Sequence, residues 1–276
     1  MTPRRLLTQA VKILQQHACT TPRLDAELLL CHVLDKPRSW LIAHADDALD
    51  APHMHAFEVL LARREKREPV AYITGEKEFW SRPFHVSPDV LIPRPETEHL
   101  IEAVLAHLPN RNAPYAMCDI GTGSGCIAVT LACEYPNARV TATDVSSAAL
   151  AVARANAERL GVAGRMYFTQ GDLYGALAGT ECFDIIVSNP PYVSQQEMED
   201  LEPELGFEPR QALTDEADGL SHLGRLVGQA ANHLTPDGLL LLETGLCGLP
   251  EASGGLRLHE RIIDLAGHLR GGIYGH

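Results

Sequence analysis

The segment Val187–Val193 holds the residues best suited to chemistry, because an apolar stretch leads there directly into Asn-Pro-Pro-Tyr. The side-chain oxygen of Asn189 and the carbonyl of Pro190 could accept both N–H bonds of a planar NH2 group, and Pro191 would help to keep them in place. Such acceptors stabilise a nitrogen that becomes cationic during a reaction, while Tyr192 could lie against the flat group and exclude water. The alternative interpretation is a strand end followed by a rigid turn.

A glycine-rich segment, Asp119–Gly125 with the sequence DIGTGSG, could bind a nucleotide-like cofactor. Glycines let the backbone approach a ligand closely, and Asp144, about twenty positions further on, is placed to hold a ribose diol. The spacing G-x-G-x-G only resembles the dinucleotide fingerprint. A tight turn between a strand and a helix, with no ligand, is the alternative.

A third polar position lies in the sequence QGDLY, where Asp172 and Leu173 follow another expected strand. An apolar side chain beside a carboxylate could sandwich an adenine ring and hydrogen-bond its edge, although a simple capping Asp would have the same sequence. The glycine segment, Asp144, Asp172 and Asn189 all follow the ends of successive expected strands. In a parallel sheet these ends share one edge, so we expect a single ligand pocket there.

Strands and helices alternate from residue 114 onwards, which predicts βαβ units around a parallel sheet. Strands are expected at 115–121, 138–145, 165–172 and 183–189, and helices at 124–135 and 146–161. Apolar residues at helical spacing predict a small helical bundle in the first seventy residues. The aromatic and β-branched segment 70–86 predicts a β-hairpin around Gly75-Glu76. Pro93 and Pro95 then exclude a helix before about Glu96.

Composition excludes several classes of function. The net charge of −13 over 276 residues argues against a surface that follows nucleic-acid phosphates, since such binding depends on Lys and Arg. The seven scattered cysteines include no C-x-x-C pair, and the thirteen histidines show no metal-ligand spacing, so we expect free thiols and no metal. No run approaches the ~18 apolar residues of a membrane span, and the N-terminus lacks a continuous apolar signal region. We therefore expect a soluble, cytoplasmic protein.

The chain resembles a class I S-adenosylmethionine-dependent methyltransferase and, more narrowly, the HemK/PrmC family. The segments that carry this resemblance are TPRLDAELLLCHVL, LLARREKREPVAYITGEKEFW, PFHVSPDVLIPRPETE, DIGTGSGCIA, TATDVS, IIVSNPPYV, LEPELGFEPRQAL and DGLLLLE. The resemblance implies an α/β, Rossmann-like fold with a mostly parallel seven-stranded sheet. It also implies three parts: a helical substrate-docking domain at 1–70, a β-hairpin and proline-rich linker at 71–95, and a methyltransferase domain at 96–276.

The resemblance further implies an activity and its residues. A methyl group would pass from S-adenosylmethionine to the side-chain amide nitrogen (N5) of the glutamine in the Gly-Gly-Gln motif of class 1 peptide chain release factors. The cofactor would be bound by Gly121, Thr122, Gly123, Ser124, Gly125, Asp144, Asp172, Leu173 and Asn189. The catalytic residues would be Asn189, Pro190 and Tyr192, and the substrate would be received by Asn189, Pro190, Pro191, Tyr192, Arg94 and Glu96. The resemblance also implies that the segment with Arg94, Glu96, Thr97 and Glu98 borders the pocket. The alternative for this segment is a proline-bounded linker with acidic residues at a helix start.

Two other functions stay open. The exocyclic NH2 of a nucleic-acid adenine poses the same chemical problem, but enzymes that act on it flip the base and contact phosphates, which the acidic composition disfavours. A catalytically silent module that only binds the cofactor is disfavoured by the presence of both Asn189 and Asp144.

The C-terminal segment departs from the family pattern. After Glu243 the family continues with an apolar helix and a closing pair of strands, but the segment 245–262 is Gly-rich and weakly periodic. The later sequence DLAGHLRGGIYG still resembles the final strand. The sequence alone therefore leaves the edge of the sheet undefined.

Overall fold

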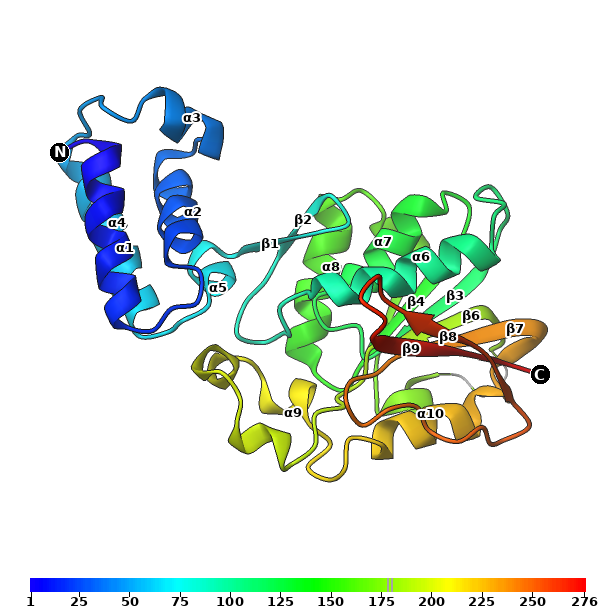
Figure 1. Ribbon diagram of the computed structural model, residues 1–276. Helices are drawn as coiled ribbons and strands as arrows, with labels where there is room; N and C mark the ends of the chain where they lie inside the picture. The colour runs from blue at the N-terminus through cyan, green and yellow to red at the C-terminus, as the bar shows by residue number, and fades with distance from the viewer. Residues whose placement is uncertain (178, 180) are drawn as a thin grey trace. The chain divides into compact units, whose positions relative to one another are not determined.

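The computed structural model of the chain describes residues 1–177, 179 and 181–276 and divides them into two compact units (Figure 1). Unit 1 consists of Met1–Glu76 together with Glu202–Phe207, and unit 2 consists of Lys77–Leu201 together with Glu208–His276. The chain thus leaves unit 2 after Leu201 and returns to it at Glu208, a path that no sequence pattern indicated. The functional domain boundaries at 70 and 95 remain predictions.

Unit 1 is a helical bundle whose helix starts are set by local sequence. Its helices are α1 (Pro3–Gln16), α2 (Pro22–Leu34), α3 (Arg38–Ala43), α4 (Ala51–Glu65) and α5 (Val70–Thr74). The side chains of Thr2 and Asp50 accept from backbone N–H groups in the first turns of α1 and α4, and α1, α2 and α4 each have a proline within their first two positions. Apolar residues of all five helices form one core, which confirms the predicted bundle.

A buried ion network ties α2, α4 and the segment 202–207 together within unit 1. Arg64 Nε donates to Asp25 Oδ2 at 2.8 Å, and Arg64 Nη2 donates to Glu204 Oε1 at 2.8 Å. Arg67 Nε donates to the same Glu204 oxygen at 2.7 Å. The side chains of Arg64 and Asp25 are only 5% and 6% exposed, so both charges are largely removed from water and each depends on its partner.

The hairpin predicted around Gly75-Glu76 turns at a different place. Residues 70–74 form helix α5, and Gly75 ends it with φ of +77°. The hairpin consists of β1 (Glu76–Phe79) and β2 (Arg82–His85), and its turn is Trp80-Ser81, where both residues have positive φ. The expected turn position was wrong because a glycine with positive φ serves equally well as a helix C-cap.

Unit 2 is built on a seven-stranded sheet in the order β5-β4-β3-β6-β7-β9-β8. The parallel strands are β3 (Ala116–Ile120), β4 (Arg139–Asp144), β5 (Met166–Gln170), β6 (Phe183–Ser188) and β7 (Leu234–Glu243). At the other end, β9 (Leu269–Gly275) is antiparallel to both β7 and β8 (Arg257–Ile263). The four strands expected from the sequence and the mostly parallel α/β fold are confirmed.

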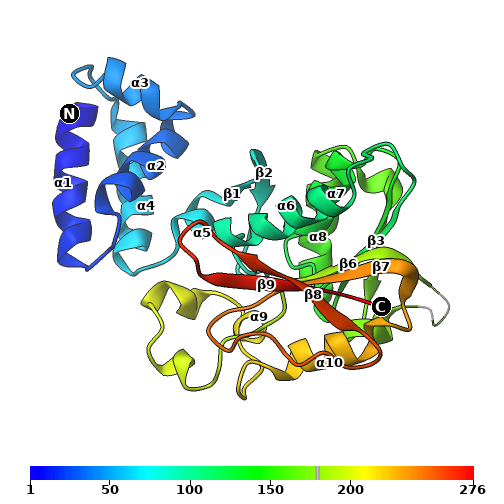
Figure 2. The same ribbon diagram turned by 45° about the vertical axis from the view of Figure 1, so that its right-hand side comes forward.

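Helices cover both faces of this sheet (Figures 1 and 2). Helices α6 (Glu98–His107), α7 (Cys126–Glu134) and α8 (Ser147–Arg159) pack on one face, where the hairpin residues Phe79 and Phe84 join their core. Helix α10 (Ser221–Ala230) and the 3-10 turn Leu173–Ala176 pack on the other face. Because its central strands are buried on both sides, the sheet needs continuous apolar runs such as that in β7. The remaining short elements are α9 (Arg210–Leu213) and 3-10 turns at Pro95–Thr97, Ala163–Arg165, Glu197–Glu199 and Pro203–Phe207.

The C-terminal stretch completes the sheet without a further helix. Residues 244–256 contain no helix or strand, yet Leu256 is only 4% exposed and joins the apolar cluster on the α10 face. A side chain at Gly271 would place a Cβ 2.3 Å from the carbonyl oxygen of Leu242, so glycine is needed for β9 to approach β7. Strand β8 forms the edge of the sheet that the sequence left undefined.

Loss of Arg64 should destabilise unit 1 strongly. We expect Arg64→Ala to lower the free energy of unfolding by about 3–5 kcal/mol, because the buried carboxylate of Asp25 loses its partner. The control Arg4→Ala breaks an exposed ion pair with Asp46 and should leave stability nearly unchanged. Urea denaturation followed by Trp40 fluorescence, in a Trp80→Phe background, reports on unit 1. Similar effects of the two substitutions would contradict the role of the buried network.

Candidate active site

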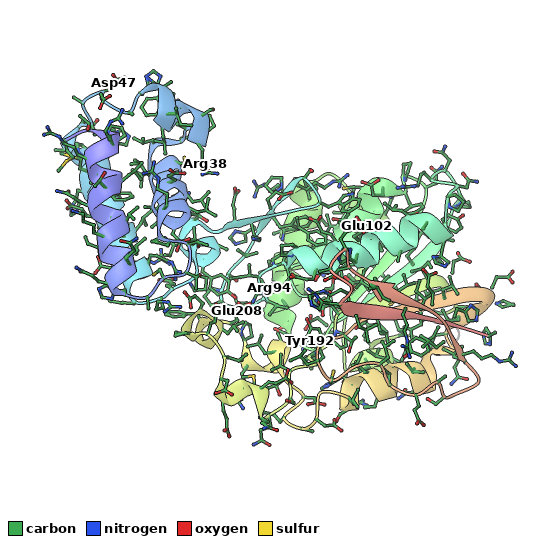
Figure 3. All side chains as sticks on the ribbon, viewed as in Figure 1. Arg38, Asp47, Arg94, Glu102, Tyr192 and Glu208 are labelled. Atoms are coloured by element: carbon green, nitrogen blue, oxygen red, sulfur yellow. The ribbon has the colours of Figure 1, made fainter. Side chains whose placement is uncertain are left out.

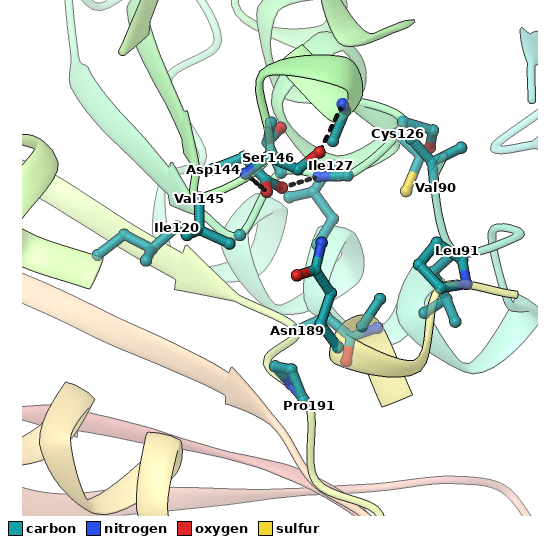
Figure 4. A pocket seen from close by; sticks show the side chains of 18 of the residues that line it. Val90, Leu91, Ile120, Cys126, Ile127, Asp144, Val145, Ser146, Asn189 and Pro191 are labelled. Carbon is teal, nitrogen blue, oxygen red and sulfur yellow. Dashed lines mark hydrogen bonds between the residues drawn. The ribbon is translucent and has the colours of Figure 1, made fainter. Parts of the chain in front are cut away.

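A cavity opens in unit 2 at the carboxyl edge of the sheet, where the strand order reverses between β3 and β6. It encloses about 980 Å³ of empty space, a volume that includes open solvent at its mouth. Its walls come from the loops that follow β3, β4, β5 and β6 and from the segments 89–97 and 209–212 (Figure 4). Ligands of open α/β sheets bind at such a reversal.

The structure brings most of the predicted site residues to this cavity. Those that line it are Gly121, Thr122, Gly123, Ser124, Asp144, Asp172, Leu173, Asn189, Pro191 and Arg94. The lining residues do not include four others that the sequence also predicted: Gly125, Pro190, Tyr192 and Glu96. The individual cofactor and substrate roles remain predictions, and the geometry below indicates what each residue can do.

The glycines of the loop after β3 serve two different needs. Gly121 and Gly123 have φ of +77° and +54°, and a Cβ on either would meet nothing within 4 Å. Glycine is therefore required there by the backbone conformation, and it leaves open space beside the loop. Gly125 also has positive φ, but its Cβ would lie 3.0 Å from the Cβ of Ala153. Gly125 thus allows α7 to start close against α8.

Asp144 links the glycine loop to the end of β4. Its Oδ2 accepts from the backbone N–H of Gly123 and its Oδ1 from the backbone N–H of Ser146, each at 2.9 Å (Figure 4). Burial raises the pKa of this carboxyl group, and the backbone donors oppose that shift. Each carboxylate oxygen has two lone pairs, so both retain the capacity to accept from a ligand hydroxyl.

Asp119, near the end of β3, is hydrogen-bonded to the same glycine loop. It was not predicted as a functional residue. It is fully buried, and its Oδ2 accepts from Thr122 Oγ1 at 2.7 Å and from the backbone N–H of Ala128 at 3.1 Å. Its Oδ1 has no hydrogen-bond partner within the described part of the chain. Burial therefore raises the pKa of Asp119 to about 7. The signal in the sequence was the acidic residue that opens DIGTGSG.

The loop after β5 presents Leu173 in an unusual conformation. Its φ is +47°, in the left-handed region that costs an ordinary residue about 1–2 kcal/mol. Strain of this kind concentrates at ligand sites. The preceding Asp172 is exposed, and its Oδ2 accepts from Arg225 Nη2 at 2.6 Å.

The Asn-Pro-Pro-Tyr segment is held at both ends. Asn189 Nδ2 donates to Thr97 Oγ1 at 3.1 Å, and the Tyr192 hydroxyl donates to Glu243 Oε1 at 2.9 Å. A Cβ on Gly245 would lie 2.8 Å from two carbons of the Tyr192 ring, which shows how closely the backbone after β7 packs against that ring. Burial raises the pKa of Tyr192, so its phenol remains a neutral donor.

Glu208 fixes the segment that carries Arg94. Its Oε2 accepts from the backbone N–H of Ile92 at 3.0 Å, and its Oε1 accepts from Arg94 Nη2 (Figure 3). Glu208 is buried, so this pair holds the cavity wall firmly in place. No role was predicted for Glu208 or Glu243, although both lie in segments that carry the family resemblance. Thr97 belongs to a segment that the resemblance placed at the border of the pocket, and it lines the cavity.

The charges around the cavity favour a ligand with positive charge. Three carboxylates line it, those of Asp89, Asp144 and Asp172. Asp172 is paired with Arg225, and the one arginine in the lining, Arg94, is paired with Glu208, so Asp89 and Asp144 leave the balance negative. No lysine is present among the lining residues. The acidic surroundings therefore attract a cation and disfavour phosphate groups.

Several other features of the described residues bear on the class of protein. No group of three or more His, Cys, Asp and Glu side chains in the described chain could hold a metal ion. All seven cysteines are free thiols. None of the helices in the described residues has the length and apolar character needed to cross a membrane.

The sheet order, the glycine loop after β3 and the acidic residue at the end of β4 define a class I methyltransferase fold. Two family models match the chain: the PrmC N-terminal domain at residues 5–75 and the methyltransferase small domain at residues 101–218. The chain is 49% identical over 252 residues to the release factor glutamine methyltransferase of Bordetella pertussis, covering 89% of this chain and 92% of that relative. The protein belongs to the release factor glutamine methyltransferase family.

Other comparisons agree with this placement. The corresponding protein of Nitratidesulfovibrio vulgaris is 45% identical over 241 residues, covering 87% of this chain and 81% of the relative. Among solved structures, the catalytic domain of hMettl16 in complex with MAT2A 3'UTR hairpin 6 has a TM-score of 0.53 at 16% identity, covering 70% of this chain and 74% of that one. At this identity the structural likeness shows the fold alone.

Gly245→Ala should disturb the packing of Tyr192. The added methyl group would lie 2.8 Å from the ring, so we expect the free energy of unfolding to fall by about 1–3 kcal/mol through overpacking. The control Gly224→Ala, inside α10 with nothing within 4 Å of its Cβ, should instead stabilise by about 0.5–1 kcal/mol. Urea denaturation measures both. If Tyr192→Leu fails to relieve the cost of Gly245→Ala, the contact is assigned wrongly.

Proposed function

We propose that this protein transfers a methyl group from S-adenosylmethionine to the side-chain amide nitrogen (N5) of the glutamine in the Gly-Gly-Gln motif of class 1 peptide chain release factors. The observation that carries the proposal is the orientation of Asn189. Its Nδ2 is engaged by Thr97, and none of the described residues donates to its Oδ1. Figure 4 shows this side chain extending from the segment after β6 towards the side of the cavity where Asp144 and Ser146 lie.

The residues present fit the cofactor. The open space beside Gly121 and Gly123 admits a ligand against the backbone, and the Asp144 carboxylate can accept from both hydroxyls of a ribose. Thr122 and Ser124 would border the methionine part, while Asp172 and Leu173 would border the adenine. When bound, S-adenosylmethionine supplies an electrophilic methyl group on a positively charged sulfur, which suits the acidic surroundings.

Asn189 and Pro190 would do the main chemical work of the protein. An amide nitrogen is a weak nucleophile because its lone pair is delocalised, and it becomes cationic as it gains the methyl group. The Asn189 Oδ1 and the Pro190 carbonyl would accept the two N–H bonds and stabilise that charge, which preorganised dipoles do efficiently. Holding the nitrogen in line with the methyl group supplies much of the remaining rate enhancement. The extra proton leaves to water after transfer, so no catalytic base is required.

Tyr192 and Pro191 would shape the place of the glutamine side chain. The Tyr192 hydroxyl is committed to Glu243, so only the face of its ring is available to lie against the flat amide and exclude water. Pro191 lines the cavity itself. Arg94, held by Glu208, and the nearby Glu96 would border the approach of the substrate.

The same proposal covers the partner and the roles of the domains. Glycines beside the target glutamine give it the freedom to enter a cleft, and an intact release factor would be gripped at a second surface by the helical residues 1–70. The hairpin and linker at 71–95 would join them to the methyltransferase domain at 96–276. We expect no direct binding to nucleic acid, since the net charge is −13. The setting of such a reaction is the cytoplasm.

Asp144→Asn should weaken cofactor binding. Removal of one charge-assisted acceptor costs about 1.5–3 kcal/mol, so the dissociation constant for S-adenosylmethionine should rise by roughly ten- to a hundredfold. Isothermal titration calorimetry measures the change. Glu158→Gln, an exposed substitution on α8, is the control and should bind as the unaltered protein does. An unchanged affinity of Asp144→Asn would refute the ribose assignment.

Methylation of recombinant release factor, followed by mass spectrometry, tests the proposed function. We expect one methyl group on the Gly-Gly-Gln glutamine, a slower reaction with a short Gly-Gly-Gln peptide and none with DNA. Asn189→Ala should lower turnover by on the order of a hundredfold, as for loss of an oxyanion-hole donor, while cofactor affinity stays near that of the unaltered protein. Methylation of DNA but not of release factor would favour the adenine alternative, and cofactor binding without any turnover would favour the silent module.

A further inference from the structure

Three consecutive residues of the glycine loop are each hydrogen-bonded to a polar side chain from a different element of unit 2. The pairs are Thr122 with Asp119 of β3, Gly123 with Asp144 of β4, and Ser124 with Asn156 of α8. The first two side chains belong to the strands that carry the site, whereas Asn156 comes from a helix packed on one face of the sheet. Asn156 is 0% exposed and was not predicted as a functional residue.

Asn156 uses its whole amide group in hydrogen bonds to the backbone. Its Oδ1 accepts from the N–H of His85 at 2.7 Å. Its Nδ2 donates to the carbonyl of His85 at 2.9 Å and to the carbonyl of Ser124 at 2.8 Å, so both N–H bonds are used. If the amide turned over, its oxygen would face two carbonyl oxygens and its NH2 group would face an N–H. Only one orientation therefore satisfies all of these groups.

His85 is the residue from which a second wall of the cavity starts. It ends β2, which lies beside α8 (Figure 1). The chain then passes through the buried Val86 to the segment 89–94, most of whose residues line the cavity. Asn156 lies 71 residues from His85 and 32 from Ser124 along the chain. One side chain is thus bonded to the backbone of both segments that border the cavity.

A second contact fixes the distance between α8 and the glycine loop. Ala153 lies three positions before Asn156, and residues at this spacing share one face of a helix. A Cβ on Gly125 would lie 3.0 Å from the Cβ of Ala153, so the loop approaches α8 as closely as a glycine allows. The hydrogen bond from Asn156 holds the adjacent Ser124 to the same face. Helix α8 therefore serves as the surface against which the loop is set.

We infer that Asn156 is a positioning residue of the cofactor site, which holds the glycine loop and the segment 89–94 at a fixed separation and so sets the space that the cofactor enters. This inference rests on the proposed function, in which the glycine loop borders the cofactor. Asn156 is not among the residues that line the cavity, so it acts through the backbone of its partners. Supporting hydrogen bonds of this kind hold a site within about 0.5 Å of its productive geometry.

A residue that served only the fold would behave differently from one that positions the site. Loss of a buried hydrogen bond lowers stability wherever it occurs, but it changes the affinity of the folded protein only where it moves the site. Tyr135 offers a matched comparison. It is 0% exposed, and its hydroxyl donates to the carbonyl of Leu108 at 2.9 Å. It follows the end of α7 that is remote from the glycine loop.

Three variants test the inference. Asn156→Asp keeps the size of the side chain and the acceptor for His85 but removes the NH2 group, Asn156→Ser shortens the side chain, and Tyr135→Phe is the control. The readouts are the dissociation constant and stoichiometry for S-adenosylmethionine by calorimetry, kcat with intact release factor at saturating cofactor, and thermal unfolding. Because the stoichiometry reports the folded fraction, the dissociation constant refers to folded molecules alone.

We expect both Asn156 variants to bind S-adenosylmethionine roughly tenfold more weakly and to lower kcat by up to about a hundredfold, because a shift of about 1 Å in a supporting segment has effects of this size. Tyr135→Phe should lower the unfolding temperature and leave the dissociation constant and kcat unchanged.

Several outcomes would overturn the inference. One is an unchanged dissociation constant and kcat in the Asn156 variants with only their stability lowered, and another is an equal loss of affinity in Tyr135→Phe. Failure of both Asn156 variants to fold would mean that Asn156 serves the fold alone. An unaltered protein that does not bind S-adenosylmethionine would refute the proposed function and the inference with it, whereas normal binding and turnover by all the proteins refutes the inference only.

Discussion

The parallel pairing of β3 with β4 on one side and with β6 on the other is the constraint on which the site depends. The registers Ile120↔Thr143 and Asp119↔Val187 bring the ends of three strands to one level. The loops that follow them must therefore face a common space. A slip of one residue would turn every side chain to the opposite face and remove Asp144 and Asn189 from it. The hydrogen bonds of Asp119, Glu208 and Glu243 hold the loops in place once the strands have paired. They could not bring the loops together without that pairing.

Local patterns in the sequence predicted the strands and the residues at their ends, whereas the supporting residues could not be found in this way. Buried parallel strands have continuous apolar runs that end abruptly, so Asp144 and Asn189 stand out. Thr97 meets Asn189 across 92 residues of chain, and Glu208 meets Ile92 across 116. No periodicity spans such separations, because these roles arise only when the fold brings distant segments together. The path of 202–207 into unit 1 was missed for the same reason.

The wrong position of the expected hairpin turn came from a signal with two meanings. Gly75 suits both a hairpin turn and a helix end, and only the competing hydrogen bonds of α5 decide between them. The stretch 244–256 has no periodicity and forms no helix, but Leu256 still supplies apolar cover to the sheet. Coverage of a sheet face requires buried apolar area and does not require a helix, which is why the final strands form despite the weak pattern.

The path of the chain through unit 1 determines what happens when the backbone is cut between the two units. The chain crosses between the units at 76–77, 201–202 and 207–208, so no single break in the backbone separates them. A nick after Glu76 would leave Asp25, Arg64 and Arg67 on one fragment and Glu204 on the other, still joined by their ion pairs. After such a nick, the fragments 1–76 and 77–276 should reassemble into one protein, because the arginines on the first fragment form ion pairs with Glu204 on the second.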